Sequence, residues 1–184
     1  MTGILAVQGD FLEHEKSLLA LGEDCFEIRK ASDLDQHFDR LVFPGGESTV
    51  QSKLIKELGL FDKLKEAFES GIPVFATCAG LILLCDTISG NEGCCFRTIP
   101  ADVKRNAYGR QLGSFYTEGE FAQLGTIPME FIRAPYIESA DDDVEILSVT
   151  DGNITGIRYK NQLAVSFHPE LCDDDKIYRY FLKM

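Results

Sequence analysis

Three side chains in the sequence have the types and the setting for nucleophilic acyl transfer: a cysteine, a histidine and a carboxylate. Cys78 stands in PVFATCAGLILLC, where a continuous apolar run at 72–77 gives way to a helical pattern. A sharp turn from a buried strand into a helix lifts its central side chain clear of the sheet, and the helix N-terminus favours a thiolate there. Free cysteines in apolar runs are more often core residues. We therefore take Cys78 as the candidate nucleophile and leave Cys85 as a core thiol.

A cysteine nucleophile needs a base, and the chain has three histidines. His14 falls in an amphipathic segment and His37 in the polar DLDQHFDR, so we expect solvated or structural roles for both. His168 ends the apolar LAVSF and is followed by Pro-Glu. Because residues i and i+2 of extended backbone project to the same side, Glu170 is expected to accept from one imidazole nitrogen while the other faces the thiol. H-P-E alone is weak evidence, but with the cysteine turn it makes a Cys-His-Glu arrangement.

The segment VFPGGEST, at 42–49, is a second place where a strand runs into a turn and a helix. It lacks the lysine and the spacing of a phosphate-binding loop. Its glycines allow close backbone approach, so an amide of Gly45 or Gly46 could join the amide of Ala79 in an oxyanion hole. The alternative is a tight turn in which Ser48 caps the helix, and both roles are compatible.

An α/β fold must position these residues. In the first half, apolar runs alternate with amphipathic stretches, which is the βαβ rhythm of a parallel sheet; we expect a strand at 72–77 and a helix at 79–88. The second half has shorter segments that predict added antiparallel strands, and DDDKIYRYFLKM predicts a last helix. We predict one domain over residues 1–184 with a doubly wound, mostly parallel sheet and helices on both faces. Gln8 and Asp10, at the carboxyl end of the first strand, are then expected near Cys78.

The composition excludes several classes of function. The chain has 184 residues, of which 45% are hydrophobic and 26% charged, as in ordinary globular proteins. Its net charge of -12, without a basic run, argues against a nucleic-acid partner. MTGILAVQGD lacks the basic region of a signal peptide, so we expect no export and no membrane span, but a cytoplasmic, reducing setting with free thiols. The cysteines form no C-x-x-C pair, so we expect no metal site.

Six segments spread over nearly the whole chain resemble the class I, triad-type glutamine amidotransferases: GILAVQGDFLEH, FPGGEST, ATCAGLILL, KRNAYGRQ, FIRAP and LAVSFHPEL. RNAYGRQ, FIRAP and VQGD narrow the resemblance to the glutaminase subunits that serve pyridoxal 5'-phosphate synthases. The resemblance implies a flavodoxin-like fold and hydrolysis of L-glutamine to L-glutamate and ammonia. It also implies that the ammonia passes to a synthase subunit that builds pyridoxal phosphate, and that the glutaminase itself needs no cofactor.

Carried over position by position, the resemblance implies that Cys78 is the nucleophile, His168 the base and then the acid, and Glu170 its orienting carboxylate. The family's glutamine-binding positions fall on Gly45, Gly46, Glu47, Arg105, Ile132 and Arg133. Charged and polar groups suit a zwitterionic amino acid, which needs partners at both ends.

Two features depart from the family pattern. Ala76 stands where such turns usually have glycine, which is acceptable only if its backbone avoids positive φ. The segment NEGCCFRTIPAD contains adjacent Cys94 and Cys95, to which we assign no role.

Two other functions compete: a glutaminase serving another synthase, such as one making imidazole glycerol phosphate, and a non-catalytic subunit that regulates a partner. RNAYGRQ and FIRAP disfavour the first, and the intact Cys-His-Glu set disfavours the second.

Overall fold

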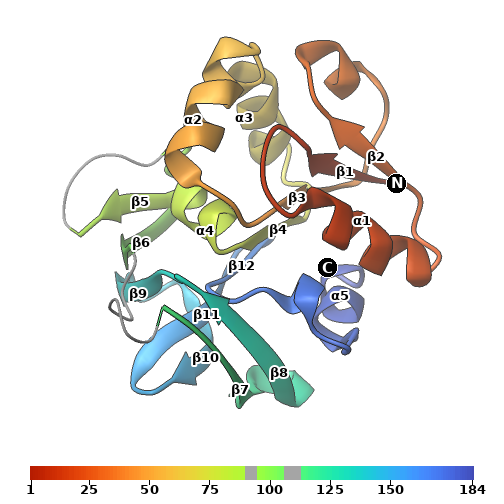
Figure 1. The fold of residues 1–184 in the computed structure, drawn as a ribbon. Coiled ribbons are helices and arrows are strands. Elements are labelled where there is room, and N and C mark those ends of the chain that lie inside the picture. Colours follow the sequence, from red (N-terminus) through yellow and green to blue (C-terminus); the bar gives the residue numbers. More distant parts are fainter. Residues whose placement is uncertain (90–94, 106–112) are drawn as a thin grey trace.

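The computed structural model describes residues 1–89, 95–105 and 113–184, and a parallel half-sheet built mainly from the first part of the chain lies at its centre (Figure 1). The strands of this half are β1 (Thr2–Leu5), β2 (Cys25–Ile28), β3 (Arg40–Phe43), β4 (Val74–Thr77) and β12 (Gln162–Val165). Their spatial order is β2-β1-β3-β4-β12, and every neighbouring pair is parallel. This is the flavodoxin-like 2-1-3-4-5 order, and it confirms the predicted fold class.

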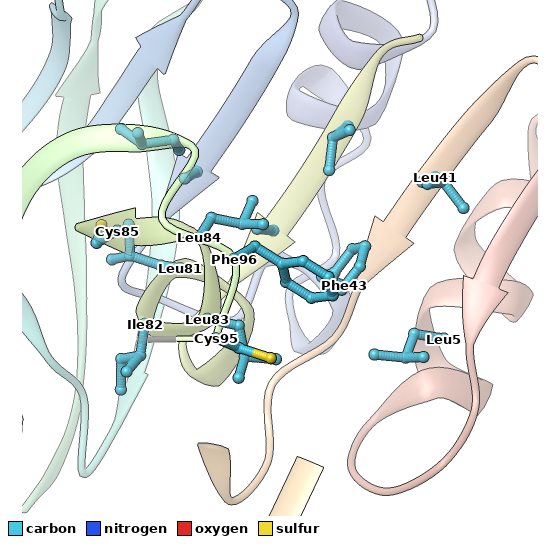
Figure 2. Packing of buried hydrophobic residues seen from close by; sticks show 14 of the residues in the cluster. Leu5, Leu41, Phe43, Leu81, Ile82, Leu83, Leu84, Cys85, Cys95 and Phe96 are labelled. Carbon is cyan, nitrogen blue, oxygen red and sulfur yellow. The ribbon is translucent and has the colours of Figure 1, made fainter. Parts of the chain in front are cut away.

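Helices cover both faces of the parallel strands, because alternate residues of each strand point to opposite sides. On one face, Leu5, Leu41 and Phe43 pack with α2 (Ser48–Glu57), α3 (Phe61–Glu69) and α4 (Ala79–Leu84). Figure 2 shows this layer, in which Phe43 lies beside Phe96. On the other face, Ile4 and Val42 pack with α1 (Phe11–Ala20) and α5 (Lys176–Phe181). The last helix was predicted from the sequence.

Antiparallel strands extend the sheet beyond β12, as predicted. They follow in the order β11 (Asn153–Tyr159), β10 (Glu145–Thr150), β7 (Ser114–Phe121) and β8 (Gly125–Ile132). A side branch contains β9 (Tyr136–Ala140), β6 (Ile99–Lys104) and β5 (Cys85–Ile88). Short 3-10 turns lie at Ala31–Asp35, Ala122–Leu124 and Pro169–Leu171. Within the described residues, no helix has both the length and the apolar character needed to cross a bilayer.

The predicted helix at 79–88 is wrong in its second half. It ends at Leu84, and Cys85, with φ -69 and ψ 156, opens strand β5, which pairs with β6. The β-branched Thr87 and Ile88 favour extended backbone. The preceding AGLILL did not indicate where the helix ends and the strand begins, because all six of its residues are apolar or small and buried. Cys85 itself is fully buried in the core, as expected, although in a strand rather than a helix. The strand predicted at 72–77 begins two residues later, at Val74.

Candidate active site

Cys78 is the one residue between β4 and α4, and its backbone is strained. Its φ of 45 and ψ of -99 lie in a region that residues other than glycine rarely adopt, at a cost of about 1–3 kcal/mol. The Cys78 N–H donates to Val165 O at 2.9 Å, which ties this turn to β12. Ala76 lies in β4 and is not among the residues with positive φ. The strain therefore falls on Cys78, and alanine is accommodated at 76.

Gly80 explains how α4 comes so close to the sheet. A Cβ at this position would stand 2.2 Å from the carbonyl oxygen of Phe43 in β3. Only a residue without a side chain allows this approach. The missing side chain of Gly80 thereby lets the first turn of α4, including Ala79, pack against β3 next to Cys78.

His168 and Glu170 are in contact, although the predicted geometry of that contact was wrong. Nδ1 of His168 lies 2.7 Å from Oε1 of Glu170. Strand β12 ends at Val165, and Glu170 belongs to the 3-10 turn that follows His168. The two side chains therefore meet through a tight turn rather than along extended backbone. The backbone N–H of His168 donates to the carbonyl oxygen of Glu130 in β8 at 2.8 Å, which fixes the start of this turn.

The charges of Cys78, His168 and Glu170 support one another. Burial by itself lowers the pKa of His168, but hydrogen bonds and charge interactions with Cys78 and Glu170 outweigh it and raise the pKa to about 10. Burial raises the pKa of Glu170, but the neighbouring His14 and His168 bring it below its usual value. The arrangement favours an imidazolium at His168 and an ionised carboxylate at Glu170.

A pocket of about 110 Å³ opens beside Cys78. Six of the site residues predicted from the sequence line this pocket: Gly46, Glu47, Cys78, Arg105, Ile132 and Arg133. Three further lining residues were not predicted as site residues: Ser48, Ile82 and Pro135. Each of these three lies within a motif noted in the sequence. Their nearness to a predicted site residue was therefore the signal that could have placed them in the pocket. The structure thus gathers segments that are far apart in the sequence around one thiol.

Opposite charges meet across this pocket. Nη2 of Arg105 lies 3.1 Å from Oε1 of Glu47 and 2.7 Å from Oγ of Ser48. The pKa of Glu47 is lowered, first by a hydrogen bond from the Thr49 hydroxyl and further by the charges of Arg105 and Arg133. Glu47 also caps α2 by accepting from the Thr49 N–H, so the suggestion that Ser48 is the helix cap was wrong.

The glycine turn predicted at 45–46 contacts His168 and the loop between β1 and α1. Gly45 lies against the ring of His168, and its carbonyl accepts from the Asp10 N–H at 3.2 Å. Gly46 has a φ of 149, and the next amide, of Glu47, donates to Oε1 of Gln8 at 2.8 Å. Gln8 and Asp10 are therefore close to the site, as predicted.

Among the described residues, one group of side chains could hold a metal ion: Asp10, His168 and Glu170, whose ligand atoms all lie within 4.8 Å of one another. Nδ1 of His168 and Oε1 of Glu170 are directed at each other as donor and acceptor at 2.7 Å. The hydrogen bond between them uses Nδ1 and Oε1, the two atoms that would have to coordinate an ion. The donor set therefore suits proton handling better than ligation.

The remaining histidines and cysteines differ in exposure. His37 is exposed and pairs with Asp39 at 3.0 Å, as expected for a solvated residue. His14 is fully buried, which makes it structural rather than solvated. Cys95 packs in the same core cluster as Cys85, and Cys94 lies outside the described residues.

The flavodoxin-like sheet, the strained cysteine turn at its carboxyl end and the adjoining His-Glu pair are the features of triad-type glutamine amidotransferases. Comparison with known proteins agrees. The chain belongs to the SNO glutamine amidotransferase family, whose model matches residues 4–184.

Curated relatives from several organisms carry the name Pyridoxal 5'-phosphate synthase subunit PdxT. The protein from Desulfitobacterium hafniense is 57% identical over 98% of this chain and 90% of its own length. The protein from Methanocorpusculum labreanum is 50% identical over 99% of this chain and 96% of its own length. A crystal structure of a glutamine amidotransferase, 40% identical, superposes with a TM-score of 0.93 over 99% of this chain and 97% of that one.

Proposed function

We propose that this chain is the glutaminase subunit of a pyridoxal 5'-phosphate synthase, hydrolysing L-glutamine to L-glutamate and ammonia for a synthase subunit. The observation that carries the chemistry is the 2.7 Å contact between Nδ1 of His168 and Oε1 of Glu170, beside the thiol of Cys78. The PdxT relatives, similar over nearly the whole chain, support the identity of the synthase.

The pocket suits a zwitterionic amino acid. Arg105 and Arg133 offer cations for the α-carboxylate, and Glu47 offers an anion for the α-ammonium. Arg105 already pairs with Glu47, so its guanidinium is held at the pocket wall before substrate arrives. With both head groups held there, the side-chain amide of glutamine extends toward Cys78. Backbone amides of Gly45, Gly46 and Ile132 complete the predicted binding set.

The first half of the reaction forms a thioester. The Cys78 thiolate attacks the side-chain amide carbon, and the amides of Ala79 and the Gly45-Gly46 turn stabilise the tetrahedral oxyanion. The His168 imidazolium then protonates the departing nitrogen as the carbon–nitrogen bond breaks, which releases ammonia. Glu170 keeps the ring in the orientation that this transfer requires.

The second half hydrolyses the γ-glutamyl thioester. Neutral His168 takes a proton from water, the resulting hydroxide attacks the carbonyl carbon, and the same oxyanion site holds the second intermediate. Its collapse breaks the carbon–sulfur bond, releases glutamate and restores the Cys78 thiolate beside protonated His168.

We place this reaction in the cytoplasm. Five cysteines in the described part of the chain form no disulfide bond, which supports a reducing setting: Cys25, Cys78, Cys85, Cys95 and Cys172. Fractionation of the source cells tests this location.

Glutamate release measured with and without the synthase subunit tests the function. We expect weak activity alone and stimulation by the synthase, and loss of both in Cys78→Ala. Cys85→Ala is the matched control, because this thiol lies in the core, and it should keep normal turnover. Stimulation by an imidazole glycerol phosphate synthase subunit instead would favour the alternative glutaminase. Full activity in Cys78→Ala would overturn the mechanism.

A further inference from the structure

Glu170 has a second oxygen that the triad does not use. Oε1 binds His168, whereas Oε2 is buried and has no hydrogen-bond partner among the described residues. An unpaired buried carboxylate oxygen is unfavourable. Facing it, at 3.5 Å, is Nε2 of His14, and both side chains are 0% exposed.

The other contacts of His14 determine which of its nitrogens carries the proton. The hydroxyl of Tyr178 lies 2.8 Å from Nδ1, and the hydroxyl of Thr77 lies 3.1 Å from Nε2. Burial raises the pKa of Tyr178 well above its usual value and lowers that of His14, so both groups are neutral. The Tyr178 hydroxyl then donates to Nδ1, and the proton of His14 sits on Nε2.

The opposite tautomer is disfavoured by electrostatics. It would direct the lone pair of Nε2 toward the negative Oε2 of Glu170, instead of an N–H dipole. At 3.5 Å the contact is a dipole facing a charge rather than a formed hydrogen bond, and the N–H is shared with the closer Thr77 hydroxyl. The sign of the interaction is nevertheless favourable for an ionised Glu170.

The network spans four elements of the fold. His14 comes from α1, Tyr178 from α5, Thr77 from β4 next to the nucleophile, and Glu170 from the turn after β12. The other ionisable groups that act on it are Asp10 and Glu13 from the first loop and helix, His168, and Cys172 near Tyr178. None of these places a donor on Oε2 in the described structure.

We propose that His14 is a positioning residue for glutamine hydrolysis: its Nε2–H, fixed by Tyr178, keeps Glu170 ionised with Oε1 toward His168. The proposal rests on the function proposed above. It adds a chain of contacts from Tyr178 through His14 and Glu170 to His168 and Cys78. If the N–H dipole is lost, a proton moves from His168 to Glu170 more readily, and the thiolate of Cys78 loses its imidazolium.

Three variants of the network and one control separate this role from simple packing. His14→Met fills the site without a donor, whereas His14→Gln retains an N–H group near the position of Nε2. Tyr178→Phe removes one oxygen and keeps the ring packed against Phe75. Phe181→Leu, in the same helix and core layer but outside the network, is the control for a general loss of stability.

The measurement is the pH dependence of Cys78 alkylation by iodoacetamide, read by mass spectrometry of the Cys78 peptide. In His14→Met we expect Cys78 to be alkylated about tenfold more slowly at neutral pH, because the imidazolium beside it is lost. Tyr178→Phe should slow alkylation less, and His14→Gln should restore most of the wild-type profile. Phe181→Leu should leave the profile unchanged. A wild-type profile in folded His14→Met would overturn the proposal.

A second measurement needs no variant. In ¹⁵N-labelled wild-type protein, the nitrogen chemical shifts of His14 should show Nε2 protonated and Nδ1 unprotonated, and the reverse tautomer would overturn the proposal. Neither test requires glutaminase activity. Failure of the proposed function would instead appear as full glutamate release in Cys78→Ala.

Discussion

Gly45 and the ring of His168 are in such close contact that a methyl group on Gly45 would stand 2.4 Å from Cε1 and 2.9 Å from Nδ1. The glycine turn and the histidine lie far apart in the sequence, yet neither can move toward the other. The absence of a side chain at 45 therefore sets the position of the imidazole as directly as Glu170 does.

Gly45→Ala should damage catalysis more than stability. The added methyl group must displace His168, and a shift of about 1 Å in a reacting group can cost about 100-fold in rate. Steady-state glutamate release with the synthase present measures the loss. Gly119→Ala is the matched control, because its methyl group would press on the flexible end of Met129, would lie at an ordinary contact distance of 3.6 Å from Oγ1 of Thr150, and should leave turnover intact. Equal turnover in the two variants would contradict this account.

Gly80→Ala should have the opposite balance. Its methyl group would press on the backbone oxygen of Phe43, which cannot swing aside as a side chain can. We expect the free energy of unfolding to fall by about 1–3 kcal/mol, as for other overpacked cores. Urea denaturation followed by circular dichroism measures this. An unchanged denaturation midpoint would show that α4 does not depend on its close approach to β3.

Cys78→Ala should lower the pKa of His168. Burial opposes protonation of this ring, while Cys78 and Glu170 together raise the pKa to about 10. Without the thiolate one of the two favourable partners is lost, so the imidazolium should lose its proton at a lower pH. The Cε1–H signal followed by NMR across the titration measures the shift, and exposed His37 provides an internal reference in both proteins. No change in His168 would mean that the thiol and the ring are uncoupled.

Arg105→Met should weaken glutamine binding. The variant keeps a side chain of similar length but removes the cation that pairs with Glu47 at the pocket wall. We expect KM to rise by about tenfold or more, with a smaller change in kcat, because the lost contact is present in substrate and transition state alike. Lys104→Met is the control: Lys104 pairs with Glu138 and does not line the pocket. A larger effect on kcat than on KM would place Arg105 nearer the reacting atoms.

Local sequence signals were sufficient for the elements that carry the site. A buried strand followed by a helix located Cys78, and Pro-Gly-Gly after an apolar run located the turn at Gly45. The helix expected at 79–88 failed at Cys85, because an apolar run buried on all sides has no periodicity that separates helix from strand.

The partners of a buried polar group were harder to predict. His14 and Tyr178 lie in amphipathic segments at opposite ends of the chain, and each alone suits a core or a surface. Their contact depends on α1 and α5 covering the same face of the sheet, which is a property of the assembled fold (Figure 1). The same holds for the His168-Glu170 turn, where the spacing was informative but the backbone path was not.

The place of β12 in the sheet has a consequence for how the protein is made. This strand lies between β4 and β11 although it comes near the end of the chain, and it supplies the carbonyl that holds the Cys78 amide. During synthesis on the ribosome, the edge of β4 that faces β12 stays unpaired until residues 162–165 have been made and pair with it. The thiol of Cys78 therefore has no imidazole beside it until residue 168 has been synthesised, so a chain that stops before this residue carries the thiol without its histidine.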